Sequence, residues 1–183
     1  MLMRKKLRLW EFAGFLIVCA LGTLLPLLYK RTGENTFVAA FAGANGSVWE
    51  RMKLLYLPYF VFTMVEFTVF AEAFRNFFAA KAAAGLAGML LIPLLHYSLN
   101  GMFGAMPRWT DTAIFFASAA VMYALSCRLL TALSLRGAAL QFISFALLWG
   151  MMFLFLLFTY RTPHLPLFRD PVTLRYGVPA VKT

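Results

Sequence analysis

Glu66 is the acidic residue whose position says most about chemistry, because it lies inside a long apolar segment. Tyr59 and Thr63 precede it by seven and three residues, so the three side chains share one face of a helix. A carboxylate at membrane depth is costly and faces the protein interior, a cavity or a partner. The functional interpretation is a proton or cation site. The alternative is that Glu66 and Glu72 lie near the membrane interface, where Glu66 pairs with Arg75.

His96 and Asn100 form a second polar pair, four residues apart and just after Pro93. At this spacing both side chains lie on the same side of a helix, where they could share a hydrogen bond or line a pore. The competing interpretation is that His96 is a packing residue with its polar atoms satisfied. Together with Tyr59, Thr63 and Glu66, these two residues complete the set of candidate binding residues.

A third set, Glu50, His164 and Asp170, has the residue types for general acid–base catalysis at the membrane surface. The alternative for Glu50 is structural. Residues 47–50 fit a capping box, in which Ser47 accepts from the Glu50 N–H and the Glu50 carboxylate reaches the Ser47 N–H. The sequence holds no zinc spacing, phosphate loop, dinucleotide fingerprint or nucleophile elbow, so it predicts neither a metal nor a cofactor.

The composition indicates that lipid surrounds most of the chain. Its 183 residues are 62% hydrophobic and 13% charged, about half the charged share of an average soluble domain, which is roughly 25%. The 17 Lys and Arg exceed the 7 Asp and Glu and stand at the ends of apolar runs. Cations in those places contact lipid headgroups and set topology. We therefore expect the lipid bilayer, and no nucleic acid, as a partner.

Five apolar segments are long enough to cross the roughly 30 Å core of a bilayer as helices. We expect an all-α, polytopic membrane bundle, formed by residues 1–160 as one domain. The expected spans are residues 10–29, 48–72, 78–99, 112–133 and 137–160. This organisation predicts a multi-pass protein of the cell membrane, specifically the bacterial inner membrane.

Residues 35–45 are apolar but cover only about half the length of a span at 1.5 Å per residue. We expect a short helix here that lies in the interface or enters the membrane and returns. The distribution of Lys and Arg favours six spans, whereas segment length favours five. Length decides for five, because a polar turn in lipid would cost several kcal/mol.

Two further segments have distinctive compositions. Residues 161–183 contain four prolines between apolar residues, which predicts an ordered, non-helical segment packed on one end of the bundle. Ala84 and Gly88 lie four residues apart in the third span, and small residues at this spacing let helices approach closely. We interpret this face as packing within the chain. A homo- or hetero-oligomer formed through it is the alternative.

Two long motifs and two shorter ones resemble a known family. They are residues 10–15, 22–25, 45–54 and 163–173 with Tyr176 and Gly177. The chain resembles an uncharacterised family of small bacterial multi-spanning membrane proteins, a domain of unknown function, over residues 10–178. The resemblance implies a fold and no activity.

The chain departs from the pattern of that family at several polar positions. A glutamate is typical where this chain has Gly46, and a histidine where it has Arg51. Histidine and an acidic residue are also frequent near residues 26 and 30. If the resemblance implies a metal or proton site there, this chain retains Glu50, His164 and Asp170 for it.

Three functions remain open at this point. The first, which the sequence favours, is a non-catalytic, transporter-like or partner-binding bundle, motivated by Glu66 and the short segment at residues 35–45. The second is an interfacial enzyme that acts on a lipid or headgroup through Glu50, His164 and Asp170. The third is an accessory subunit whose third span packs on another protein.

Overall fold

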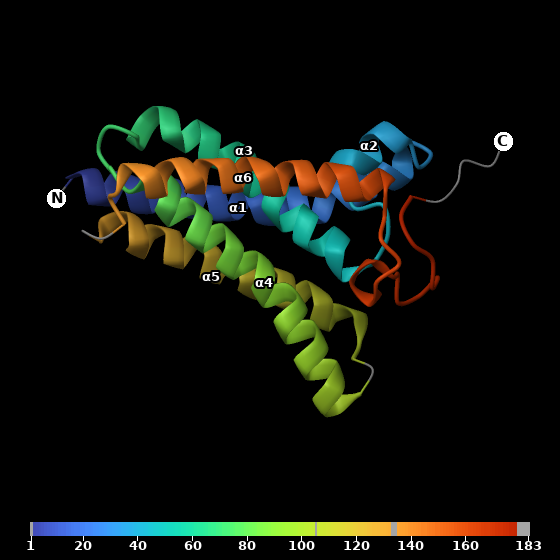
Figure 1. The fold of residues 1–183 in the computed structure, drawn as a ribbon. Helices are drawn as coiled ribbons and strands as arrows, with labels where there is room; N and C mark the ends of the chain where they lie inside the picture. Colours follow the sequence, from blue (N-terminus) through green and yellow to red (C-terminus); the bar gives the residue numbers. More distant parts are fainter. Residues whose placement is uncertain (1, 105, 133–134, 179–183) are drawn as a thin grey trace.

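The computed structural model describes residues 2–104, 106–132 and 135–178, and this part of the chain is mainly helical (Figure 1). Within it the only strand-like contact is an isolated bridge between Arg169 and Tyr176. The helices are α1 (Leu2–Arg31), α2 (Thr36–Phe41), α3 (Val48–Phe70), α4 (Phe77–Phe103), α5 (Arg108–Thr131), α6 (Ala138–Tyr160) and the short 3-10 helix η1 (Pro166–Phe168).

Five of these helices, α1, α3, α4, α5 and α6, are long and apolar enough to cross a membrane. The all-α membrane bundle with five spans is therefore confirmed. Helix α2 has six residues and a length of about 9 Å, too short to cross. Asn35 caps its start, because the Asn35 side chain accepts a hydrogen bond from the Phe37 N–H at 2.8 Å.

Helix α1 is longer than the expected span, because it begins at Leu2 and not near Trp10. Residues 2–9 contain no glycine or proline and several Leu, Lys and Arg, which are good helix formers. The extension places Glu11 nine residues inside the helix, about 13 Å from its start.

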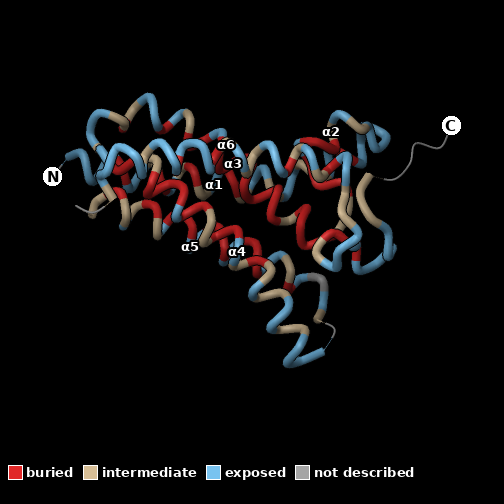
Figure 2. Tube along the Cα trace, in the orientation of Figure 1, coloured by how far each residue is buried: buried red, intermediate tan, exposed pale blue. Residues whose placement is uncertain are grey.

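Helix α3 is the central element of the bundle. In its most apolar stretch 67% of the residues are buried, compared with 17% in α1 and 22% in α6. It packs against α1, α4 and α6, while α4 packs chiefly along α5. Figure 2 shows the buried positions gathered along α3 and on the inner sides of its neighbours.

The outer surface carries large apolar side chains. Phe142 is 72% exposed and Phe153 is 59% exposed on α6, and Leu24 is 57% exposed on α1. Exposing this surface to water would be unfavourable, whereas contact with lipid tails carries no such cost.

The small residues of α4 are used for packing inside the chain. A Cβ atom added at Gly88 would lie 2.5 Å from the Cβ of Met122 on α5, and one at Gly85 would lie 2.9 Å from the Tyr59 ring. Ala84 is fully buried. The close approach of α4 to α5 and α3 therefore depends on this face.

The segment after α6 packs on the end of the bundle where α3 begins (Figure 1). Phe168 of η1 is buried, with its ring centroid 4.6 Å from that of Trp49 and 5.7 Å from that of Phe158. The expected ordered C-terminal segment is confirmed over residues 161–178, with one three-residue 3-10 turn inside it. Residues 179–183, the last part of the expected segment, lie outside the described residues.

Candidate functional site

Three charged side chains meet in the interior near the end of α3. Lys81 of α4 lies with its Nζ 2.9 Å from Glu11 Oε1 of α1, and it forms a second ion pair with Glu66 of α3. Glu66 and Lys81 are fully buried and Glu11 is 3% exposed. We call Glu11, Lys81 and Glu66 the ionic triad.

The ionic triad forms where the end of α3 and the start of α4 lie beside α1. Glu66 lies in the last turns of α3 and Lys81 in the first turns of α4, and residues 71–76 connect the two helices. Helix α1 packs along α3 and supplies Glu11. Two consecutive helices and the distant α1 therefore bring their charges together at one point of the bundle.

Aromatic rings and hydroxyls surround the ionic triad. Lys81 Nζ lies 5.7, 5.8 and 5.9 Å from the ring centroids of Tyr59, Phe77 and Tyr123, distances at which the rings stabilise a cation. Ser126 donates a hydrogen bond to Glu11 Oε1 at 2.7 Å. The Tyr59 hydroxyl donates to the Lys81 backbone carbonyl at 2.8 Å and so fixes the start of α4 against α3.

The charges of the ionic triad do not balance. Two carboxylates and one ammonium carry a net charge of −1 when all three are ionised. One oxygen of each carboxylate, Glu11 Oε2 and Glu66 Oε1, is buried without a hydrogen-bond partner among the described residues. Since an unpaired buried charge is unfavourable, binding one proton or one monovalent cation would stabilise this site.

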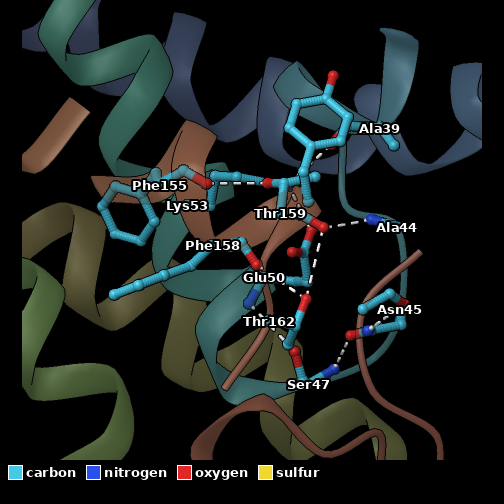
Figure 3. Close-up of polar contacts among 12 residues, drawn as sticks. Ala39, Ala44, Asn45, Ser47, Glu50, Lys53, Phe155, Phe158, Thr159 and Thr162 are labelled. Atoms are coloured by element: carbon cyan, nitrogen blue, oxygen red, sulfur yellow. Dashed lines mark hydrogen bonds and ion pairs between the residues drawn. The ribbon is translucent and has the colours of Figure 1, made fainter. Parts of the chain in front are cut away.

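A second ionic cluster lies at the other end of α3 (Figure 3). Lys53 Nζ lies 2.7 Å from Glu50 Oε2 and donates to the Ala39 carbonyl of α2 at 2.8 Å and to Thr159 Oγ1 of α6 at 3.0 Å. Glu50 Oε2 also accepts from the Ala44 N–H at 2.9 Å. We call this group the Glu50–Lys53 clamp, because it fastens α2 and the α2–α3 connection to α3 and α6.

The capping box expected at the start of α3 is half correct. Ser47 Oγ accepts from the Glu50 N–H at 3.3 Å, as expected. The reciprocal bond is absent from the described residues, because the Glu50 carboxylate binds Lys53 and the Ala44 N–H instead, and Asn45 Oδ1 accepts from the Ser47 N–H. A charged donor at 2.7 Å outcompetes a backbone N–H for the carboxylate.

Buried polar side chains recur along α3 between the ionic triad and the Glu50–Lys53 clamp. Successive members are three or four residues apart, so each lies beside the next on the helix surface. All are buried, in the order Glu50, Lys53, Tyr56, Tyr59, Thr63 and Glu66. We call this set the α3 polar stripe. Glu66 follows Glu50 by 16 positions, which corresponds to about 24 Å along the helix.

His96 and Asn100 belong to a third group, near the end of α4. His96 Nδ1 lies 2.9 Å from Asp111 Oδ1 of α5, and Arg51 of α3 forms an ion pair with the same carboxylate. Asn100 donates to the His96 backbone carbonyl at 2.7 Å and accepts from the Met106 N–H at 3.2 Å. The group joins the ends of three helices.

The three residues considered for interfacial catalysis lie at one end of the bundle, and within the described structure no hydrogen bond or ion pair links them. Glu50 is held in the Glu50–Lys53 clamp. The His164 ring packs on Tyr176, with the ring centroids 4.9 Å apart. Asp170 accepts from the Gly46 N–H at 3.1 Å and from the Val172 N–H at 2.7 Å. Both carboxylates thus hold the backbone in place.

The environment of Asp170 favours its charged form. Burial alone would raise the pKa of this carboxyl, but hydrogen bonds from the N–H groups of Val172, Gly46 and Thr173 outweigh that effect and lower the pKa below its ordinary value. The interaction stabilises the docked segment above the ordinary pKa, roughly 3.9, and is lost as the pH falls through the lower value of the folded protein.

We therefore expect acid to release the C-terminal segment from the start of α3. The measurement is tryptophan fluorescence as the pH is lowered from neutrality, in a variant that keeps Trp49, which contacts Phe168, and replaces the other three tryptophans with phenylalanine. The substitution Asp170→Asn should remove the part of the change that lies below about pH 4. Glu34→Gln is the control, because Glu34 is exposed. Identical acid midpoints for Asp170→Asn and the unmodified protein would contradict this role.

Sequence reasoning found Glu66 and missed its partners. The alternative pairing of Glu66 with Arg75 near the interface is wrong, because Glu66 pairs with Lys81 and is fully buried. Lys81 could have been found as a lone cation inside the apolar, alanine-rich start of the third span. Glu11 could have been found as a lone acid inside the first.

Among the described residues, no three His, Cys, Asp or Glu side chains gather in a way that could hold a metal ion. Comparison with known proteins finds no match among curated proteins or solved structures. It does find a match to one family, described as a family of unknown function (DUF6512), over residues 2–178. The match covers nearly the whole chain, and the protein therefore belongs to the DUF6512 family.

Proposed function

We propose that this protein is a non-catalytic, transporter-like bundle of the cell membrane that binds a proton at the ionic triad and passes it along α3. The α3 polar stripe is the observation that carries the proposal. It places buried polar side chains between two ionic clusters that lie about 24 Å apart along α3, most of the thickness of a bilayer core. Ionisable residues within a membrane are typical of proton relays and ion pathways.

A proton suits the ionic triad better than a metal cation does. The Lys81 ammonium lies between the two carboxylates and would repel a second cation placed at the same point. One proton on Glu11 or Glu66 makes the triad neutral and requires no additional ligands. It also turns an unpartnered oxygen into a hydrogen-bond donor.

Hydroxyl groups lie between the two clusters along the α3 polar stripe. A hydroxyl both donates and accepts, so it can take part in proton transfer. The Tyr56 hydroxyl donates to the Leu148 carbonyl at 2.9 Å, and Thr63 Oγ1 is buried without a partner among the described residues. Reorientation of these groups would connect the ionic triad to the Glu50–Lys53 clamp.

Proton flux into vesicles tests this function. Purified protein would be reconstituted into liposomes that contain a pH-sensitive dye, and a potassium diffusion potential would draw protons inward. We expect the vesicle lumen to acidify with the unmodified protein and to remain at the level of protein-free vesicles with Glu66→Gln.

Glu72→Gln provides the matched control. It makes the same chemical change at an exposed carboxylate outside the ionic triad, and acidification should persist. Size-exclusion profiles would establish that both variants remain folded. Equal acidification by Glu66→Gln and the unmodified protein would remove the basis for the proposal.

A further inference from the structure

A groove of about 280 Å³ lies between α1 and α5 on the outer surface of the bundle. One face of each helix lines it, with successive residues three or four positions apart. These residues are Arg8, Phe12 and Phe15 of α1 and Ala120, Ala124 and Cys127 of α5. On each helix they extend over seven positions, or about 10 Å. The groove is therefore elongated and follows the helix axes.

The accessible wall of the groove is apolar. Glu11 and Tyr123 border it, but Glu11 Oε2 and the Tyr123 hydroxyl are enclosed by the protein. Glu11 Oε1 is bound to Lys81 and Ser126. Phe12, in contrast, is 58% exposed. A molecule in the groove therefore contacts mainly carbon atoms.

Helices α1 and α5 run in opposite directions beside the groove. A Cβ atom added at Gly14 of α1 would lie 2.6 Å from the Tyr123 ring. One added at Gly22, two turns further along α1, would meet the ring of Phe115, two turns earlier in α5. The start of α1 and the end of α5 therefore lie at the same end of the groove, the end formed by Arg8.

This end of the groove lies at the level of the lipid headgroups. Helix α1 has 30 residues and a length of about 45 Å, which exceeds the roughly 30 Å of a bilayer core. The residues before Trp10 include four Lys and Arg, and cations at the end of a span lie among headgroups. From Phe12 onward the groove continues into the core, parallel to the lipid chains.

Exposed cations surround the outer end of the groove. Arg8 lies in the wall and is exposed, and Arg4 and Lys5 lie on the same side of α1, four and three residues earlier. Arg128 of α5 follows Ala124 by four residues and is exposed as well. Residues 1–10 contain no acidic residue. The ionic triad lies inward from the groove, and its net charge of −1 is outweighed by these four cations.

We propose that this groove holds one acyl chain of an anionic phospholipid, and that Arg8 binds the phosphate of its headgroup. An elongated apolar groove suits a linear hydrocarbon chain, and a guanidinium binds phosphate through two parallel hydrogen bonds. The neighbouring cations favour a headgroup with a net negative charge. The inference goes beyond the proposed function, because this site lies on the outer surface and requires no proton transfer.

Size and charge favour a lipid chain over other occupants. Pockets for drug-sized ligands span roughly 300–1,000 Å³, and this groove lies just below that range. It therefore holds part of one chain, while the rest of the lipid lies against the outer surface. A second copy of the protein, related by a two-fold axis normal to the membrane, would bring its own Arg8 beside this one, and the like charges would repel.

The test measures the lipid affinity of the purified full-length protein by native mass spectrometry from a non-ionic detergent. The probes are dioleoyl phosphatidylglycerol and dioleoyl phosphatidylcholine, which have the same chains and differ in headgroup charge. We expect one phosphatidylglycerol to bind at least about fivefold more tightly, since one cation near an anionic lipid contributes about that factor. Glycerol 3-phosphate, which has the phosphate and no chains, should not displace the lipid at equal concentration.

A first pair of variants tests the headgroup contact. Arg8→Gln should weaken the binding of phosphatidylglycerol at least about fivefold and remove most of the preference over phosphatidylcholine. Arg31→Gln is the matched control, because it makes the same change at an exposed position at the other end of α1. It should keep the full preference.

A second pair of variants tests the contact with the chain. Ala124→Phe should abolish the one-to-one complex with either lipid by filling the groove, and because residue 124 faces outward this variant keeps the fold. Ala113→Phe is the control on the same helix, at an exposed position outside the groove, and should bind like the unmodified protein.

Several outcomes would overturn the lipid site. One is equal affinity of the unmodified protein for the two phospholipids, and another is an Arg8→Gln variant that keeps the full preference. Displacement by glycerol 3-phosphate would show that the chain is not needed. A dimer that is lost in Ala124→Phe would show that a second copy covers the groove. Glu66-dependent acidification of vesicles is measured separately and stands or falls independently of these results.

Discussion

Replacing Lys81 with methionine should lower the free energy of unfolding by about 3–5 kcal/mol, because it leaves two buried carboxylates without their shared cation. The side chain of methionine is similar in length, so the loss is mainly electrostatic. Lys81 also lies near the rings of Tyr59, Phe77 and Tyr123, whose interaction with the cation disappears as well. The measurement is denaturant-induced unfolding in mixed micelles, followed by tryptophan fluorescence.

Two further variants show whether the loss of stability in Lys81→Met is caused by the unpaired charges. The triple variant Glu11→Gln, Lys81→Met and Glu66→Gln should regain most of the lost stability, because no charge remains buried. Lys5→Met removes a cation from an exposed position of α1 and should have almost no effect. A Lys81→Met protein as stable as the unmodified one would show that the ionic triad is not buried as described.

Replacing Lys53 with methionine should also lower the free energy of unfolding by about 3–5 kcal/mol. The change removes the cation that pairs with Glu50, and both side chains are buried. The change should release α2 in particular, because Lys53 Nζ binds the Ala39 carbonyl of that helix. Hydrogen exchange followed by mass spectrometry would detect this as faster exchange in residues 36–44, while α4 and α5 exchange at their original rates.

Thr159→Val separates the contributions within the Glu50–Lys53 clamp. It removes the hydroxyl that accepts from Lys53 but leaves the ion pair with Glu50 intact. Its expected cost is about 1 kcal/mol, the net value of a single hydrogen bond. If α2 exchanged equally fast in Lys53→Met and in the unmodified protein, contacts other than those of Lys53 would hold this helix.

The fold could be predicted from the sequence because the physics of the bilayer acts on segment length and polarity. A helix must be about 20 residues long to cross, and residues 35–45 are too short to do so. The start of α1 was less predictable. A basic segment at the interface and a continued helix have the same composition, and only the absence of glycine and proline favours the helix.

The candidate site could be predicted in part. Glu66, Tyr59 and Thr63 were expected on one helix because helical periodicity is a local property. The pairing of Glu66 with Lys81 and Glu11 depends on how α1, α3 and α4 pack, which periodicity does not encode. In addition, α1 begins earlier than expected, so Glu11 lies well inside this helix and not at its start. Likewise, the sequence placed Glu50 at the start of α3 but did not reveal Lys53 as its partner.

The concentration of charge on α3 has a consequence for biosynthesis. A charged residue opposes the membrane insertion of a helix, by roughly 2.5–3.5 kcal/mol when it stands at the helix centre. Helix α3 carries Glu50, Lys53 and Glu66, whereas the cation that neutralises Glu66 is made later, in α4. Helix α3 therefore depends on α4 for stable insertion. The two should leave the translocon together as a helical hairpin, against an α1 already in place.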